Sequence, residues 1–228
     1  MDRFRATWIT AWGLVQFLFG GNHDARPAPV RAIPPPADAK WAVLVHGIYN
    51  SSQSMELIKQ DLKLRGWRVC AISLKPSDAS ITFEAMARQL DAFIKANVPA
   101  GKKFDLVAFS MGGLVCRYYI QKMGGYERVR RFVTLSTPNH GTLWACLSGR
   151  AGVKEMRPNS AMLRDLNGDA SKLRGLNYTS IYTPLDLSII PATSSRMPAA
   201  HNVMLWVPMH PFMVLFPAPL REVQQALD

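Results

Sequence analysis

Short apolar runs alternate along the chain with stretches in which apolar residues recur at helical spacing. Runs such as Trp41–Val45 are typical of strands buried on both faces of a parallel sheet. The expected strands are 41–45, 68–74, 104–109, 129–136, 178–182 and 202–207, and the expected helices are 51–66, 81–98, 111–119, 160–166 and one from Leu220. This order predicts an α/β fold, a mostly parallel, doubly wound sheet with helices on both faces and ligands beyond the carboxyl ends of its strands.

The first forty residues differ from the rest. Residues 6–20 are apolar and uncharged and follow Arg3 and Arg5, but they fall short of the roughly 20 residues that a perpendicular span needs. No small-x-small cleavage site follows. We therefore expect 1–25 to be an uncleaved anchor or signal-like segment, 26–39 a proline-rich linker and 40–228 the folded domain. A helix lying at the lipid headgroups, or packed on its own domain, is the alternative.

Basic residues before an apolar run favour a cytoplasmic N-terminus, with the remainder on the periplasmic or outer-facing side. Cytoplasmic and secreted locations are the alternatives. The net charge of +11 favours an anionic partner, either a lipid surface or a polyanion. Nucleic acid is not expected, because no zinc-knuckle spacing, arginine-rich tract or aromatic RNA-binding signature accompanies the charge. The three widely spaced cysteines argue against a disulfide framework and a metal site, and we expect no cofactor.

A candidate nucleophile lies where the strand 104–109 runs into a helix. Ser110 is flanked by Ala108 and Gly112, and such small neighbours are what a sharp strand-to-helix turn requires. The turn holds the serine hydroxyl at the sheet edge, above a helix N-terminus that favours negative charge. The pattern predicts a nucleophile elbow.

A serine nucleophile needs a base, since its hydroxyl does not ionise unaided near neutral pH. Of the histidines, only His210 follows a late strand at the same sheet edge as Ser110, so it is the expected base. Between residues 170 and 228 the acids are Asp186, Glu222 and Asp228. The last two fall in the terminal helix, which leaves Asp186 to orient His210. The order Ser, Asp, His is the one expected of this type of hydrolase.

Acyl transfer also needs hydrogen-bond donors for the oxyanion. One should be the backbone N–H of Met111, directly after the candidate nucleophile. The other should come from the loop after the first strand, with the N–H of Ile48 as the best candidate. Gly47 allows a close backbone approach there, and His46 is expected to support the loop.

The elbow, the candidate acid and base, and the loop after the first strand together resemble those of the small bacterial triacylglycerol lipases and esterases of the α/β-hydrolase superfamily. The matching segments are 43–52, 105–119, 132–142, 157–167, 178–186 and 207–210. The resemblance implies a minimal α/β-hydrolase fold with Ser110 as nucleophile, Asp186 and His210 as its partners, and Ile48 and Met111 as oxyanion donors. It also implies a structural role for His140. Two positions depart from the pattern, because Ala108 replaces the first glycine of the elbow and Phe109 its usual histidine.

The expected function is serine-dependent hydrolysis of apolar carboxylic esters at a membrane surface. Residues 197–220 carry no Lys, Arg, Asp or Glu; some of their apolar side chains should be core, and others near His210 could line an acyl pocket or face lipid. The short segment from His140 to Tyr178 has room for a helix or two but not for a large lid, which favours short or medium acyl chains or substrates presented by a membrane. Acyl transfer to an alcohol or amine, and a catalytically silent interaction module, are the alternatives.

Overall fold

A single parallel sheet organises the chain. The computed structural model describes residues 35, 36 and 38–228, so the segment 1–25 and most of the linker 26–39 lie outside the described residues. The strands are β1 (Trp41–Val45), β2 (Arg68–Ile72), β3 (Phe104–Phe109), β4 (Val129–Leu135), β5 (Asn177–Tyr182) and β6 (His201–Met204). They lie in the order β2-β1-β3-β4-β5-β6, and every neighbouring pair is parallel. This confirms the predicted fold class.

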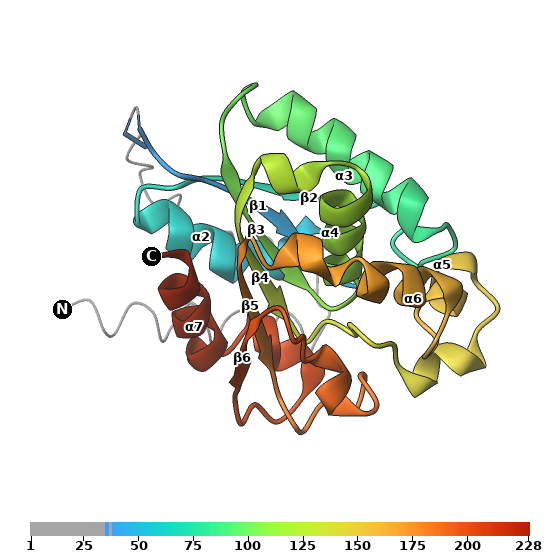
Figure 1. Ribbon diagram of the computed structural model, residues 1–228. Coiled ribbons are helices and arrows are strands. Elements are labelled where there is room, and N and C mark those ends of the chain that lie inside the picture. The colour runs from blue at the N-terminus through green and yellow to red at the C-terminus, as the bar shows by residue number, and fades with distance from the viewer. Residues whose placement is uncertain (1–34, 37) are drawn as a thin grey trace, which may run out of the picture.

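Helices cover both faces of the sheet (Figure 1). One face carries α2 (Glu56–Leu64) and α7 (Pro217–Leu227), and the other carries α3 (Phe83–Asn97), α4 (Met111–Lys122), α5 (Ala151–Glu155) and α6 (Ala161–Gly168). Short 3-10 turns complete the chain: η1 (Ser52–Met55), η2 (Gly125–Glu127), η3 (Leu143–Leu147), η4 (Ala170–Leu173), η5 (Ala192–Ser195) and η6 (His210–Val214).

The alternation of side chains along each strand divides the core into two layers. In β1, Val43 and Val45 pack into the cluster beneath α3 and α4. Ala42 and Leu44 point the other way, into the cluster beneath α2 and α7. Because both faces are covered, every position of β3 is buried. The central strand thus provides a rigid base for the residue that follows it.

Several element boundaries differ from the predicted ones. The helix expected at 51–66 begins as η1 and becomes α-helical only at Glu56. The strand expected at 202–207 is His201–Met204, since the chain leaves the sheet after pairing with Tyr182. The last helix begins at Pro217 rather than Leu220, because proline is tolerated in a first helical turn. The α5 helix was not predicted, and its five residues are too few to show a helical period.

Among the residues that the structure describes, no helix has both the length and the apolar character needed to cross a membrane.

Candidate active site

Ser110 lies in a sharp turn between β3 and α4. Its backbone has φ 52° and ψ −125°, outside the ordinary region for a residue with a side chain. Such a conformation costs on the order of 1–3 kcal/mol and persists only where its surroundings impose it. Here the Ser110 N–H donates to the carbonyl of Leu135 at 2.8 Å, and the Ser110 carbonyl accepts from Gly113 N–H at 3.0 Å. The backbone geometry is that of the predicted elbow.

Close packing explains the glycines around this turn. A Cβ at Gly112 would lie 2.4 Å from the backbone oxygen of His46, which no rotamer change could relieve. A Cβ at Gly47 would lie 3.0 Å from Cβ of Ser110. The first loop of the sheet and the start of α4 are therefore in direct contact, and this contact brings the 46–48 loop up to the elbow.

Asp186 and His210 meet beyond the ends of β5 and β6. The Nδ1 of His210 donates to Oδ2 of Asp186 at 2.6 Å, and the Asp186 side chain is almost fully buried. Oδ1 of Asp186 accepts the N–H groups of Ser188 and Ile189, both at 2.9 Å. Together these bonds hold the carboxylate of Asp186 in one orientation.

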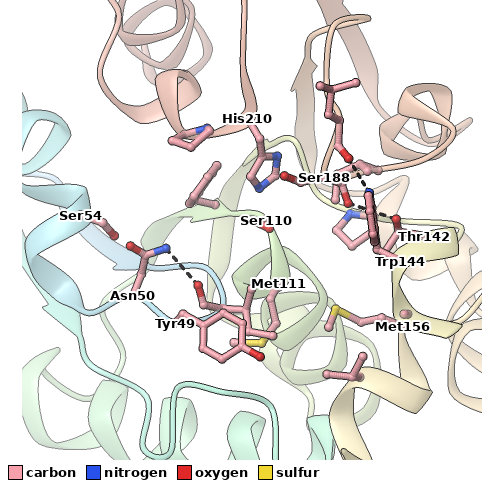
Figure 2. A pocket seen from close by; sticks show the side chains of 18 of the residues that line it. Tyr49, Asn50, Ser54, Ser110, Met111, Thr142, Trp144, Met156, Ser188 and His210 are labelled. Atoms are coloured by element: carbon pink, nitrogen blue, oxygen red, sulfur yellow. Dashed lines mark hydrogen bonds between the residues drawn. The ribbon is translucent and has the colours of Figure 1, made fainter. Parts of the chain in front are cut away.

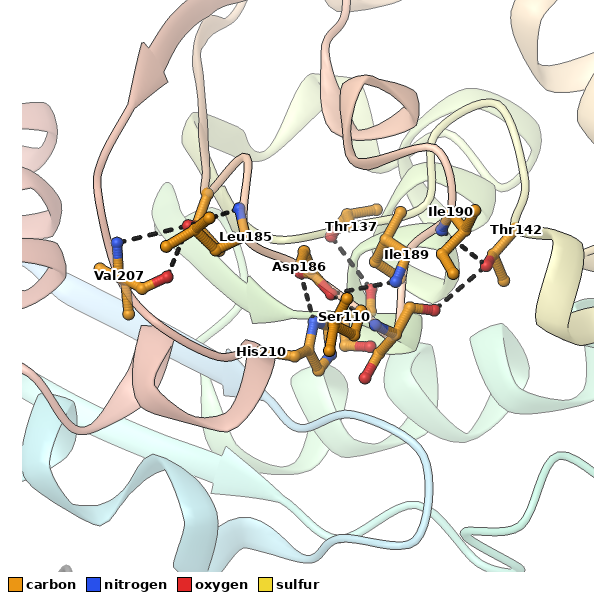
Figure 3. Close-up of polar contacts among 12 residues, drawn as sticks. Ser110, Thr137, Thr142, Leu185, Asp186, Ile189, Ile190, Val207 and His210 are labelled. Atoms are coloured by element: carbon orange, nitrogen blue, oxygen red, sulfur yellow. Dashed lines mark hydrogen bonds and ion pairs between the residues drawn. The ribbon is translucent and has the colours of Figure 1, made fainter.

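Ser110 and His210 lie side by side (Figures 2 and 3), and both line one cavity (Figure 2). Because Asp186 occupies Nδ1, Nε2 is the ring nitrogen left for a proton from Ser110. The ring of Phe109 lies 4.7 Å from that of His210. The aromatic residue that replaces the usual histidine thus supports the imidazole through packing.

Two backbone amides are placed as candidates for the oxyanion site. Met111 begins α4 directly after Ser110, and Ile48 follows Gly47 in the loop that contacts the elbow. Both residues line the same cavity as Ser110. Among the described residues, neither amide donates a hydrogen bond to another group. Both N–H groups are therefore available to a ligand.

His46 is fully buried behind this loop. Its Nε2 accepts the N–H of Leu74 at 2.9 Å, and its Nδ1 lies 2.7 Å from the carbonyl of Gly47. These two bonds require a neutral ring with the proton on Nδ1. Burial lowers the pKa of His46, which the bond to Gly47 only partly offsets. A neutral ring with both nitrogens engaged suits the predicted supporting role.

The cavity has a volume of about 540 Å³ and is lined mostly by apolar side chains. One wall comes from the 48–54 segment and from η6, and the opposite wall comes from residues 142–156 and 187–189. Sequence reasoning missed this second wall, which includes Thr142, Trp144 and Met156. One signal for this wall was available in the sequence: an apolar run at 143–147 is followed shortly by basic residues.

The two remaining histidines of the described residues lie outside the cavity. His140 does not line the cavity; its Nδ1 contacts the side-chain amide of Asn167 at 3.3 Å. His201 begins β6, at the opposite end of that strand from His210. Within the described part of the chain, no group of three or more His, Cys, Asp or Glu side chains could hold a metal ion.

Comparison with known proteins gives a consistent result. The family model described as palmitoyl protein thioesterase matches residues 42–190. The lysosomal thioesterase PPT2 of Homo sapiens is 30% identical over 121 residues, which cover 51% of this chain and 38% of the relative. The chain thus matches well under half the length of that relative.

Solved structures agree in fold. The mature lipase BlEst2 of Bacillus licheniformis superposes with a TM-score of 0.67 at 18% identity, over 86% of this chain and 96% of the lipase. Lipase B of Aspergillus fumigatus gives a TM-score of 0.65 at 17% identity, over 88% of this chain and 57% of the lipase. The fold is therefore the α/β-hydrolase fold.

Proposed function

This chain belongs to the palmitoyl protein thioesterase family, and from that membership we propose that it is a serine hydrolase that cleaves apolar acyl esters, thioesters included, through an acyl-enzyme. The observation that carries the proposal is the pairing of His210 with Asp186 directly beside Ser110 on a strained elbow. A histidine oriented by a carboxylate next to a serine is the arrangement that activates a hydroxyl for attack.

The reaction begins when Oγ of Ser110 attacks the acyl carbon and its proton passes to Nε2 of His210. Asp186 stabilises the imidazolium so formed. The carbonyl oxygen becomes an oxyanion, which accepts hydrogen bonds from the amides of Ile48 and Met111. His210 then protonates the departing alkoxide or thiolate as the bond to the acyl carbon breaks.

Water completes the cycle on the acyl-enzyme. A water molecule gives a proton to His210 and attacks the acyl carbon, and a second oxyanion forms at the same two amides. Its collapse returns the proton to Oγ of Ser110 and releases the carboxylic acid. An alcohol or amine in place of water would give acyl transfer through the same steps.

The lining of the cavity supports an apolar acyl group as substrate. Its volume of about 540 Å³ is in the range of small-molecule sites. Buried side chains such as Ala145, Val153 and Met156 form part of the wall opposite the 48–54 segment and present apolar surface to the cavity. Medium-length acyl chains fit this description, on a thioester as well as on an oxygen ester.

A substrate panel tests the reaction. Matched p-nitrophenyl esters and acyl thioesters of rising chain length should be hydrolysed with an optimum at medium length, and free acid should be the main product. A product dominated by acylated alcohol or amine, when one is added, would indicate a transferase. Absence of turnover on the whole panel, together with no fluorophosphonate labelling of Ser110, would indicate a silent interaction module and contradict the proposal.

We further propose that the enzyme works on substrates presented by a lipid surface. Leu143 and Leu147 are exposed on η3 beside the cavity, and Trp144 of η3 and Leu187 are exposed on the cavity wall itself. The indole N–H of Trp144 donates to the carbonyl of Leu187 at 2.6 Å, which joins the two segments. Exposed apolar side chains grouped around a site are typical of an interaction surface.

Basic residues next to this apolar surface favour an anionic membrane. Arg150 lies three residues after η3 and Lys154 lies in α5, and both are exposed, although Arg150 also pairs with Asp78 at 3.3 Å. Their charge would add to apolar contact at an anionic headgroup layer. Residues 6–20 would act as a second point of attachment, on the periplasmic or outer-facing side. Replacing Trp8 and Trp12 with serine in the full chain should then weaken vesicle binding but leave hydrolysis of a soluble ester unchanged.

A further inference from the structure

The 137–142 loop, which follows β4, is bonded at one end to the elbow. The hydroxyl of Thr137 donates to the backbone carbonyl of Ser110 at 3.0 Å, and both residues are buried. A Cβ at Gly113 would lie 2.0 Å from the same hydroxyl oxygen, so Thr137 packs directly on the first turn of α4. Because of this contact, a shift of Thr137 would displace the backbone of Ser110.

The other end of the loop is bonded to the segment that holds Asp186. The hydroxyl of Thr142 donates to the carbonyl of Ser188 at 3.1 Å and accepts the N–H of Ile190 at 3.0 Å (Figure 3). The same short segment holds Asp186, because the N–H groups of Ser188 and Ile189 donate to its Oδ1. Thr142 therefore fixes the backbone that sets the direction of the carboxylate.

A buried cation holds the middle of the loop. Arg117 of α4 is fully buried, and its guanidinium donates to the backbone carbonyl of Asn139 at 3.2 Å and to its side-chain oxygen at 3.3 Å. Its remaining bonds go to the amide oxygens of Gln121 and Asn167. Among the described residues, no carboxylate lies within ion-pair distance of it. Burial lowers the pKa of Arg117 to about 10, so the group still carries its charge near neutral pH.

We propose that the 137–142 loop sets the position of Ser110 relative to Asp186 and His210, with Thr137 and Thr142 as positioning residues and Arg117 as the anchor between them. The proposal rests on the proposed function. Its basis is that one short loop is bonded to the backbone of the nucleophile at one end and to the backbone around the acid at the other. Misplacement by about 1 Å costs on the order of a hundredfold in rate, so these hydroxyls should affect turnover more than substrate binding.

Thr137→Val and Thr142→Val test this proposal, because valine keeps the shape and removes the hydroxyl. Thr134→Val is the control for loss of a buried hydroxyl on β4, since Thr134 bonds to Tyr178 and Ser180 and reaches the loop only indirectly, through the bond between Tyr178 and Asn139. Two rates should be measured: phosphonylation of Ser110 by a fluorophosphonate, which needs no known substrate, and kcat on the best ester. We expect each test variant to lose about tenfold in both rates. KM should stay unchanged in Thr137→Val, because Thr137 does not line the cavity, and the control should stay close to the wild type.

Two further variants separate positioning from general damage. Thr142→Ser restores the hydroxyl and should recover most of the lost rate, whereas a role in packing alone would leave it impaired. The double variant Thr137→Val/Thr142→Val should lose less than the product of the two single losses, because both act through one loop.

The possible failures are distinguishable. Thr137→Val and Thr142→Val that react at the rate of the wild type, or a control that loses as much as they do, would overturn the loop's role and leave the proposed function standing. A wild-type protein that is not labelled at Ser110 would overturn both proposals.

Discussion

Nδ1 of His210 donates a hydrogen bond of 2.6 Å to Asp186, which lies 24 residues earlier in the chain. The carboxylate cannot turn to follow the ring, because its other oxygen is held by two backbone amides of its own loop. The acid therefore sets the tautomer and direction of the imidazole, and not the reverse. This asymmetry determines what a neutral replacement of the acid would do.

Asp186→Asn should lower kcat/KM by roughly a thousandfold to ten-thousandfold. The asparagine oxygen would take the two amides of Ser188 and Ile189, so its NH2 group would face His210 Nδ1. Nδ1 would then have to accept, which puts the ring proton on Nε2, where it blocks transfer from Ser110. Asp165→Asn, at an exposed acid paired with Lys122, is the control. Activity of Asp186→Asn within a few-fold of that control would contradict the orienting role.

Gly112→Ala should destabilise the fold by about 1–3 kcal/mol or more, because its Cβ would lie 2.4 Å from the backbone oxygen of His46. Urea unfolding followed by circular dichroism measures this free energy. Gly168→Ala at the end of α6 is the control, since nothing lies within 4 Å of a Cβ there. Equal stability of the two variants would show that the loop and the elbow are not in the tight contact described.

Acid should destabilise the protein partly through His46. Burial lowers the pKa of His46 in the folded state below the ordinary value of 6.5. As the pH falls, His46 is therefore protonated in the unfolded chain at a higher pH than in the folded protein. Stability from this residue is present above about pH 6.5 and is lost as the pH falls through the lowered folded value. Protonation would also turn Nε2 into a donor facing the N–H of Leu74.

Melting temperatures of wild type and His46→Gln between pH 7.5 and 5 test this expectation. Glutamine can keep a donor and an acceptor without titrating, so the variant should show a weaker fall with acid. His140, whose pKa is lowered by burial and by Arg117, contributes in the same direction and stays in both proteins. Parallel curves would exclude His46 as a contributor.

Leu147→Ser should weaken binding to anionic phospholipid vesicles and slow hydrolysis of vesicle-borne esters, while activity on a short soluble ester stays unchanged, because Leu147 does not line the cavity. Leu64→Ser is a matched control, because Leu64 is 70% exposed against 75% for Leu147. Leu64 ends α2, just before β2 begins, at the sheet end opposite the site. Vesicle co-sedimentation measures the binding. Equal losses in both variants would rule out a specific lipid-facing surface.

The sequence predicted the strands well because burial on both faces of a parallel sheet leaves continuous apolar runs. Trp41–Val45 and Phe104–Phe109 agree with the structure to the residue. The same logic predicted the small residues around Ser110. Only glycine fits where Gly112 meets the backbone of His46. The glycine in the local sequence pattern therefore reflects a contact with a residue far away in the chain.

The cavity wall and the bonds around the site were beyond sequence reasoning. Periodicity gives no signal for α5 and η3, which are too short, yet they form the wall that includes Trp144 and Val153. Thr137 and Thr142 look like ordinary loop threonines in the sequence. Their hydroxyl partners are known only once β3, β4 and the 186–190 segment are placed side by side.

The turnover of Ser110→Ala, on an ester or thioester that the wild type hydrolyses, tests the central claim most directly. The variant removes one oxygen from a folded protein, which circular dichroism can verify. We predict a loss of several orders of magnitude in kcat, with only the residual rate that oxyanion donors and binding can supply. Turnover close to that of the wild type would contradict the claim that Ser110 is the nucleophile.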